Sequence, residues 1–164
     1  MLFEDIYNAD IEQLEVLLKQ LREEVHKEVE IDDVEDIYGI NKRIRRFQEE
    51  VNFQIDRTET LISKIGPSRY EKEKLNFLGM SLARIMSAMA DEDEDLDDDL
   101  TASASNAHSQ GKTNLANAIN KVKKVIQNTI SPIISKISKT IGQIILNLLT
   151  PKTGVLMENW GQEF

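Results

Sequence analysis

The fold is decided by residues 113–149, which read TNLANAINKVKKVIQNTISPIISKISKTIGQIILNLL. Apolar side chains recur there at steps of four, three and four residues, so each position repeats every eleven residues. Eleven residues over three turns is about 3.67 residues per turn, which keeps the apolar stripe on one side of a nearly straight helix. Such a helix would be about 55 Å long, and it must cover the stripe because a helix with a wet apolar face is not stable alone. The stripe consists of Leu115, Ile119, Val122, Ile126, Ile130, Ile133, Ile137, Ile141, Ile144 and Leu148.

One proline lies inside this pattern. Pro132 has no N–H to donate to the carbonyl of Asn128, and its ring clashes with that carbonyl, so it kinks or breaks a helix. We therefore expect a hinge at Pro132, with either one bent helix or two segments over about 113–130 and 132–149. The eleven-residue rows continue through Pro132 without a change of phase, so both halves are expected to bury the same face.

Three earlier segments carry apolar residues at heptad spacing, and we expect each to be a helix. The first covers about 10–29 and has Asp10 as its N-cap. The second runs from about 32 to Gly66-Pro67, a pair that ends helices. The third begins at Ser68, which opens a Ser-x-x-Glu capping box, and continues to about residue 90. The seams of the first two contain Leu14, Leu18, Leu21, Ile44, Phe47 and Val51.

Two polar residues interrupt the seam of the second helix. Gln54 and Thr58 occupy heptad positions where apolar residues are expected. Polar seam residues often fix the register of packed helices at a cost in stability. The alternative is that the stripe has rotated and both residues face water.

Residues 91–112 interrupt the helical patterns. Asp91 to Asp99 is acidic at every position except Leu96, and the stretch from Thr101 to Gln110 is small and polar. Because packed like charges repel and extend a chain, we expect a mobile linker here. The sequence therefore divides into an acidic helical bundle over 1–90, a linker over 91–112, an amphipathic helix over 113–150 and a tail over 151–164.

Charge is distributed unevenly along the 164 residues. The chain has a net charge of −9. Residues 101–164 contain seven lysines and two acids, hence +5, which leaves −14 for residues 1–100. One interpretation is that the two halves neutralise each other within or between subunits. The other is that the basic half binds an anionic surface and the acidic half restrains it.

Motifs for catalysis or cofactor binding are incomplete. Gly111-Lys112-Thr113 lacks the first glycine of a phosphate loop, and we expect a glycine turn with Thr113 as a helix cap. Glu23-x-x-His26 is half of a di-iron motif, which needs a second copy. The acidic run has Leu96 where a calcium loop needs glycine. We therefore expect no enzyme activity, catalytic residues, metal or cofactor.

The sequence also bears on partners and location. The chain has no cysteine and its first residues are acidic, so we expect no disulfides and no signal peptide, which favours the cytoplasm. The basic cluster of Lys42, Arg43, Arg45 and Arg46 lies among acids and without aromatic platforms, so we expect it to pair with a protein or with this chain, and not with nucleic acid.

The polar face of residues 113–149 has lysine as its only charged residue. A soluble bundle helix usually mixes both charge signs, whereas lysines opposite an apolar stripe suit a lipid interface. The strict eleven-residue rows equally suit packing of one helix on another. Both interpretations stay open at this point.

We therefore predict an all-α protein, an antiparallel bundle or coiled coil of three heptad helices with one long amphipathic C-terminal helix. The predicted function is a non-enzymatic interaction or oligomerisation module, with a homo-oligomer or a helical protein as partner. The alternative is a membrane-active protein, peripheral to an anionic bilayer, whose C-terminal helix is controlled by the acidic half. The predicted interaction face is Leu14, Leu18, Leu21, Ile44, Phe47, Val51, Ile126, Ile130, Ile133, Ile137, Ile141, Ile144 and Leu148.

Overall fold

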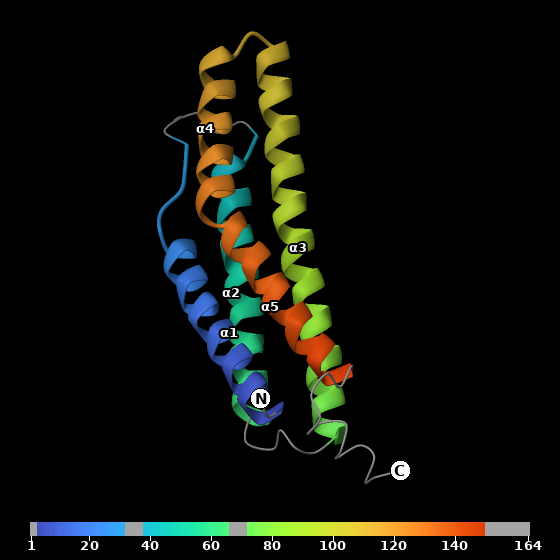
Figure 1. Cartoon of the computed structure of the whole chain (residues 1–164). Helices are drawn as coiled ribbons and strands as arrows, with labels where there is room; N and C mark the ends of the chain where they lie inside the picture. The colour runs from blue at the N-terminus through green and yellow to red at the C-terminus, as the bar shows by residue number, and fades with distance from the viewer. Residues whose placement is uncertain (1–2, 32–37, 66–71, 150–164) are drawn as a thin grey trace.

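The computed structural model describes residues 3–31, 38–65 and 72–149. They form the helices α1 (Phe3–Val25), α2 (Ile40–Ile65), α3 (Lys72–Ser109), α4 (Thr113–Thr129) and α5 (Ser131–Leu149) (Figure 1). The described residues contain no strand, and the predicted all-α helical bundle is confirmed. The expected caps and turns at Gly66-Pro67 and Ser68, and the tail over 151–164, lie outside the described residues.

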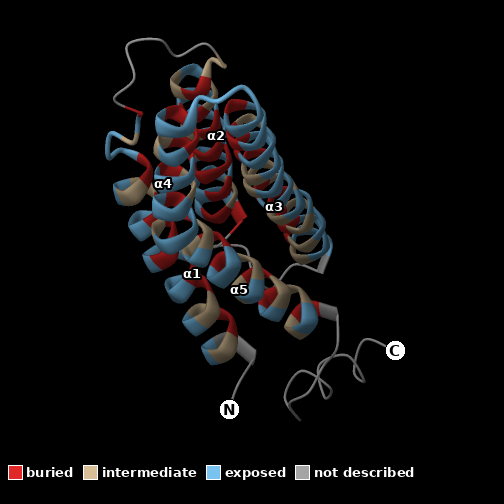
Figure 2. Cartoon of the chain, turned by 90° about the horizontal axis from the view of Figure 1, so that it is seen from above, coloured by how far each residue is buried: buried red, intermediate tan, exposed pale blue. Residues whose placement is uncertain are grey.

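The helices run alternately up and down. In Figure 1, α1 rises from the N-terminus, α2 descends, α3 rises along the whole bundle, and α4 followed by α5 descends against α3. Each helix turns its apolar stripe inward, so the buried residues line the space between the helices (Figure 2). This is the burial that heptad spacing predicts for amphipathic helices.

The prediction of a mobile linker over 91–112 is wrong for residues 91–109, which continue α3 as helix. Leu96 and Leu100 are almost fully buried, and Ala104 and Ala107 extend the same stripe toward the end of the helix. One apolar residue every three or four positions is enough to hold a helix against its neighbours. The acidic residues occupy the other faces of α3, where most of them are exposed.

Gly111 makes the tight turn between α3 and α4. It adopts a left-handed φ of 75°, which glycine tolerates because it has no Cβ. Lys112 N–H donates to the Ala107 carbonyl at 2.8 Å and Gly111 N–H to the His108 carbonyl at 3.1 Å. These bonds are the Schellman pattern that closes a helix C-terminus. Thr113 is not the predicted cap, since Lys112 holds that position without a side-chain hydrogen bond.

The long C-terminal helix is broken next to the predicted hinge. α4 ends at Thr129 and α5 begins at Ser131, so Pro132 sits in the first turn of α5, where its missing N–H costs little. The apolar rows continue past the break, since Ile137, Ile141, Ile144 and Leu148 are all buried on the same face, and only one position departs from them. Ile134 is 2% exposed, whereas Ile133 is only half-buried. The prediction of Ile133 as a core residue is therefore wrong, because the break rotates the start of α5.

α1 is shorter than expected at its C-terminal end and covers only the lower part of the bundle (Figure 1). Residues 26–31 leave the helix and are anchored to α2 by side-chain hydrogen bonds. The Ile31 N–H donates to Asn41 Oδ1 at 2.8 Å, and Asn41 Nδ2 donates to the Ile31 carbonyl at 3.2 Å. This clamp holds the Ile31 side chain in the core, at 4% exposure.

The two polar seam residues of α2 are buried, so the interpretation that they face water is wrong. Thr58 Oγ1 donates to the Gln54 carbonyl at 2.7 Å, and Gln54 Oε1 accepts from Arg57 Nη1 at 3.1 Å. Both side chains therefore have partners within their own helix.

The first residues of two helices also differ from the prediction, since Asp10 lies inside α1 and α2 begins at Ile40, later than residue 32.

Candidate functional site

The predicted interaction face lies inside the chain. All of its residues are buried except Ile133, which is half-buried. Leu14, Leu18 and Leu21 of α1 face the same interior as the stripes of the other helices. These residues hold the bundle together, so the surface that remains free for a partner is a different set of side chains.

The acidic run of α3 contacts three other helices. Arg43 Nε of α2 donates to Asp99 Oδ2 at 2.7 Å. Gln127 Nε2 of α4 donates to Asp97 Oδ1 at 2.8 Å. Ser131 Oγ of α5 donates to Asp93 Oδ1 at 2.7 Å. The run is therefore used as a line of hydrogen-bond acceptors along the bundle.

The lysines of α4 and α5 take no part in these contacts. None of Lys121, Lys123, Lys124, Lys136 and Lys139 forms an ion pair within the described part of the chain. Four of the five are exposed, and Lys123 is half-buried. The side-chain partners of Asp93, Asp97 and Asp99 are one arginine and two neutral residues. The predicted neutralisation of the acidic half by the basic half therefore does not occur through ion pairs of these lysines.

Two aspartates that face α5 have perturbed pKa values. Burial raises the pKa of Asp93 above its ordinary value, against the opposing effect of the Ser131 hydrogen bond, and the charge of Asp97 raises it further. Burial likewise raises the pKa of Asp10, which accepts from Asn147 Nδ2 at 2.8 Å. Both carboxylates are therefore held in places that disfavour their charge.

An apolar groove opens between the start of α3 and the end of α5. It has a volume of about 420 Å³, and its only polar lining residue is Asn76. Gly79 forms part of the wall, where an added Cβ would lie 3.5 Å from Leu148 Cδ1. The remaining lining residues are Leu75, Met80, Ala83, Ile145 and Leu148.

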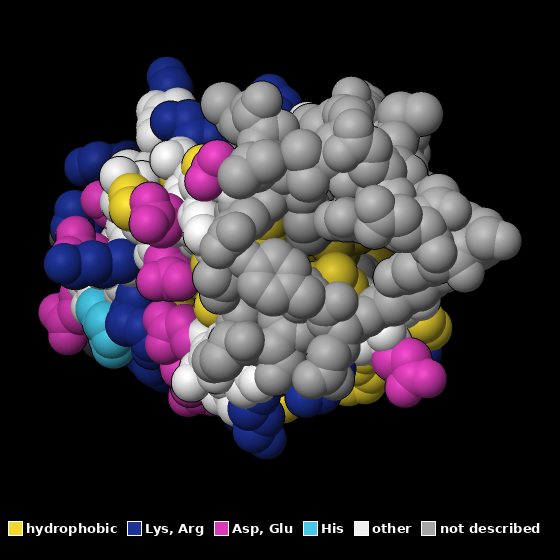
Figure 3. All heavy atoms as spheres, turned by 60° about the horizontal axis from the view of Figure 1, so that its bottom comes forward, with side chains coloured by type: hydrophobic (Ala, Val, Ile, Leu, Met, Phe, Trp, Pro, Cys, Tyr) yellow, Lys and Arg dark blue, Asp and Glu magenta, His cyan; other side chains and the backbone are white. Residues whose placement is uncertain are grey.

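Large apolar side chains are also exposed on the two helices that form this groove. Phe77 is 58% exposed, Met80 is 62% exposed and Leu146 is 40% exposed. Among the described residues, the other exposed side chains of this kind are Val16, Phe53 and Val125, which belong to other helices. Figure 3 shows hydrophobic side chains on this end of the bundle, beside and between the atoms that are not described. The groove, together with Phe77 and Leu146, forms the candidate site, here called the α3–α5 patch.

Metal-ligating side chains are scattered among the described residues. No group of three or more histidine or acidic side chains among them could hold a metal ion. His26 and His108 are both exposed, on separate parts of the chain. No helix in the described ranges is long and apolar enough to cross a bilayer.

Comparison with known proteins gives no relative. No family model, curated protein or solved structure matches this chain.

Proposed function

We propose that this protein is a non-enzymatic helical interaction module that associates with a second copy of itself through the α3–α5 patch. The observation that supports the proposal is that three exposed apolar side chains, Phe77, Met80 and Leu146, belong to the two helices that form one apolar groove. Scattered apolar residues are normal on protein surfaces, but a groove flanked by several of them is typical of a binding site.

The patch contains both parts of a self-complementary contact. The groove can accept an apolar side chain, and Phe77, which follows the lining residue Asn76 in the sequence, is an exposed side chain of suitable size. In a two-fold symmetric dimer the same patch faces its own copy, so Phe77 of each copy can enter the groove of the other. A helical partner of different sequence would need to supply such a side chain itself.

The apolar area buried between the two copies sets the expected stability of the dimer. At about 200 Å² for a large side chain, the exposed fractions of Phe77, Met80 and Leu146 correspond to roughly 300 Å² per copy. Burying this area on both copies is worth about 15 kcal/mol at 25 cal/mol per Å². Association costs about 4–15 kcal/mol in lost freedom. We therefore expect a weak dimer that depends on concentration.

The test is sedimentation equilibrium of the full chain and of two matched variants. Phe77→Glu places a charge in the patch and should leave a monomer at concentrations where the wild type is dimeric. Phe53→Glu is the control, because Phe53 has a similar exposure of 55% and lies on α2. A wild-type monomer at all concentrations, or equal loss of dimer in both variants, would overturn the proposal.

A different occupant would give a different signal. The only tryptophan of the chain is Trp160, close to the C-terminus. If the C-terminal residues of the same chain fill the groove, the wild type should be monomeric and Phe77→Glu should shift Trp160 emission to longer wavelength. That combination would contradict association of two copies.

A second candidate function is binding of an anionic membrane by α4 and α5. The observation in its favour is that these helices carry five lysines and no acidic residue. Their apolar faces are buried in the bundle, so lipid binding would require them to separate from α3. Vesicles containing phosphatidylserine should then become leaky in the presence of the protein, and intact vesicles would exclude this function.

A further inference from the structure

Charges of opposite sign are segregated onto neighbouring helices of the bundle. α4 and α5 together contain five lysines and no acidic residue, whereas residues 91–99 of α3 contain eight acids and no basic residue. Such segregation gives the surface two fields of opposite sign, and fields of this kind direct association between molecules.

Four lysines of α4 and α5 have no acidic partner. Lys121 and Lys124 are three residues apart in α4, and Lys136 and Lys139 are three residues apart in α5, so each pair shares a helix face. All four are exposed, and none forms an ion pair with another described residue. No acidic residue separates the two pairs. These four residues are here called the lysine face.

α3 carries an equal number of unpaired carboxylates. Asp91, Glu94, Asp95 and Asp98 follow the spacing of one side of a helix, and all four are exposed. None of them forms an ion pair within the described ranges. These four residues are here called the acid face.

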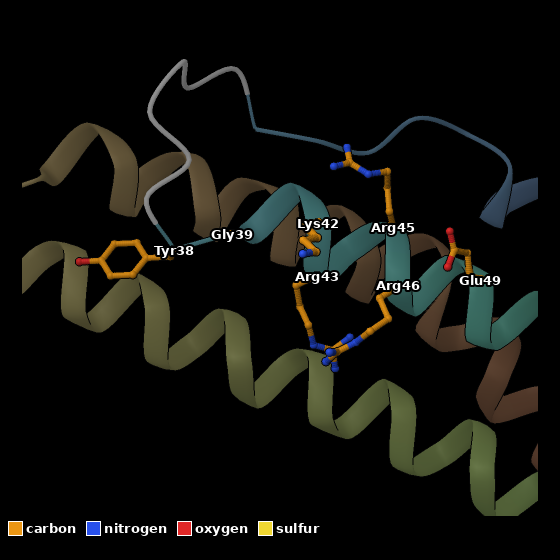
Figure 4. A pocket seen from close by; sticks show the side chains of 7 residues that line it. All are labelled: Tyr38, Gly39, Lys42, Arg43, Arg45, Arg46 and Glu49. Carbon is orange, nitrogen blue, oxygen red and sulfur yellow. The ribbon is translucent and has the colours of Figure 1, made fainter.

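Basic residues of α2 compensate a different part of the acidic run. Arg43 Nε donates to Asp99 Oδ2 at 2.7 Å, and Figure 4 shows the side chains of Arg43 and Arg46 extending from α2 toward α3. Compensation from α2 therefore includes Asp99 and leaves the acid face without an ion pair.

The acid face lies level with the middle of the lysine face. The hydrogen bonds of Gln127 and Ser131 to the acidic run hold it beside the break between α4 and α5. Lys124 and Lys136 each lie six residues from Ile130, or about 9 Å along a helix. The acid face itself is about 10 Å long. A second copy can therefore lay its acid face over the break, where flexible lysine side chains reach it from both ends.

We propose that the lysine face of one copy binds the acid face of a second copy, in a contact separate from the α3–α5 patch. A second copy is the occupant because the chain itself carries the complementary face, with the same number of charges, on the neighbouring helix. Since each copy has both faces, a two-fold arrangement forms the contact twice.

Salt sets the conditions under which this contact forms. The whole chain has a net charge of −9, which opposes association of two copies. At about 0.1 M salt the screening length is about 10 Å, far less than the roughly 57 Å of α3. Repulsion between whole molecules is then mostly screened, while facing side chains still attract each other. At about 1 M salt the screening length is about 3 Å, and this attraction is lost as well.

Sedimentation velocity of the full chain carrying Phe77→Glu tests the proposal without any contribution from the α3–α5 patch. Its weight-average mass should exceed that of a monomer at about 0.1 M salt and fall to the monomer value at about 1 M, with the association constant reduced about tenfold or more. Failure of the patch would show instead as a wild type that is monomeric at about 1 M salt, so the two proposals are separable.

Charge reversal locates the contact. In the Phe77→Glu chain, Lys136→Glu with Lys139→Glu, and separately Glu94→Lys with Asp98→Lys, should each abolish self-association. An equimolar mixture of these two chains should associate again, because each then meets a complementary face. Lys19→Glu with Lys64→Glu is the control, because it makes the same change in net charge at exposed sites on α1 and α2 and should associate as the parent does.

Three results would overturn the proposal: a mass that does not depend on salt, an equal loss of association in the control, or a mixture that stays monomeric. If the lysine face binds an anionic bilayer instead, the Phe77→Glu chain should stay monomeric at both salt concentrations. It should then float with phosphatidylserine vesicles in a manner that requires Lys136 and Lys139, and that result would also contradict association of two copies.

Discussion

Replacing Ile133 or Ile134 by alanine tests which of these two residues near the start of α5 is buried, since the structure and the eleven-residue pattern of the sequence give different answers. Ile133 belongs to the repeating rows of the sequence, whereas Ile134 does not. In the structure Ile134 is 2% exposed and Ile133 is only half-buried. The two residues are adjacent in one helix, so any gain in helix propensity from alanine is nearly the same for both and cancels in the comparison.

Burial sets the expected size of each effect. Ile134→Ala removes three carbon atoms from a closed site, which costs about 2.4 kcal/mol at 0.8 kcal/mol per carbon, and the cavity left behind raises this to about 3–4 kcal/mol. Ile133→Ala removes the same atoms from a partly wet site, where the cost is about 1 kcal/mol. The variants should therefore differ by roughly 2 kcal/mol in the free energy of unfolding.

Urea unfolding followed by circular dichroism at 222 nm measures this difference. For a protein of this size the 3 kcal/mol loss also lowers the melting temperature by about 6–12 °C. The slope of the unfolding free energy against urea should stay the same in both variants, which shows that the compactness of the end states is unchanged. If Ile133→Ala costs as much as Ile134→Ala, the apolar rows pass the break undisturbed and the reasoning about α5 is refuted.

Two further predictions concern α3. Asp93→Asn should stabilise the protein at neutral pH, because the pKa of Asp93 is raised in the folded protein, so its contribution to stability is present at acidic pH and is lost as the pH rises through the raised pKa. The variant keeps an acceptor for Ser131. Denaturation at several pH values tests this, since the advantage of the variant should vanish where Asp93 is protonated in both the folded and the unfolded chain. Leu96→Ala should cost about 2–5 kcal/mol by the same measurement, since Leu96 is 1% exposed, whereas no loss would mean that residues 91–109 are a linker after all.

The helical fold could be predicted from the sequence because each helix repeats its apolar residues with a helical period. Such periodicity reports which face of a helix is covered, and it identified twelve of the thirteen proposed face residues as buried. It does not report what covers them. The sequence alone therefore also allows the seams to be surfaces for a partner, although the chain folds back and covers them itself.

The α3–α5 patch could not be found in this way, because it forms where the ends of two helices meet. Gly79 and Met80 stand out in the sequence only as a poor helix former and a flexible apolar residue. They become part of a groove only when Ile145 and Leu148 are brought beside them. Since that meeting depends on the length of α3 and on the break before Ser131, no local pattern contains it.

The acidic run shows why local charge is a weak guide to conformation. Repulsion between like charges one turn apart disfavours a helix by only a few tenths of a kcal/mol for each pair. Burying Leu96 and Leu100 recovers about 1.5–3 kcal/mol for each side chain, and the contacts of Asp93, Asp97 and Asp99 lie on three other helices. The free energy gained by burying two leucines therefore outweighs the repulsion among eight carboxylates, provided that most of those carboxylates stay hydrated. Exposure of most of the run is thus a condition for α3 to extend to Ser109.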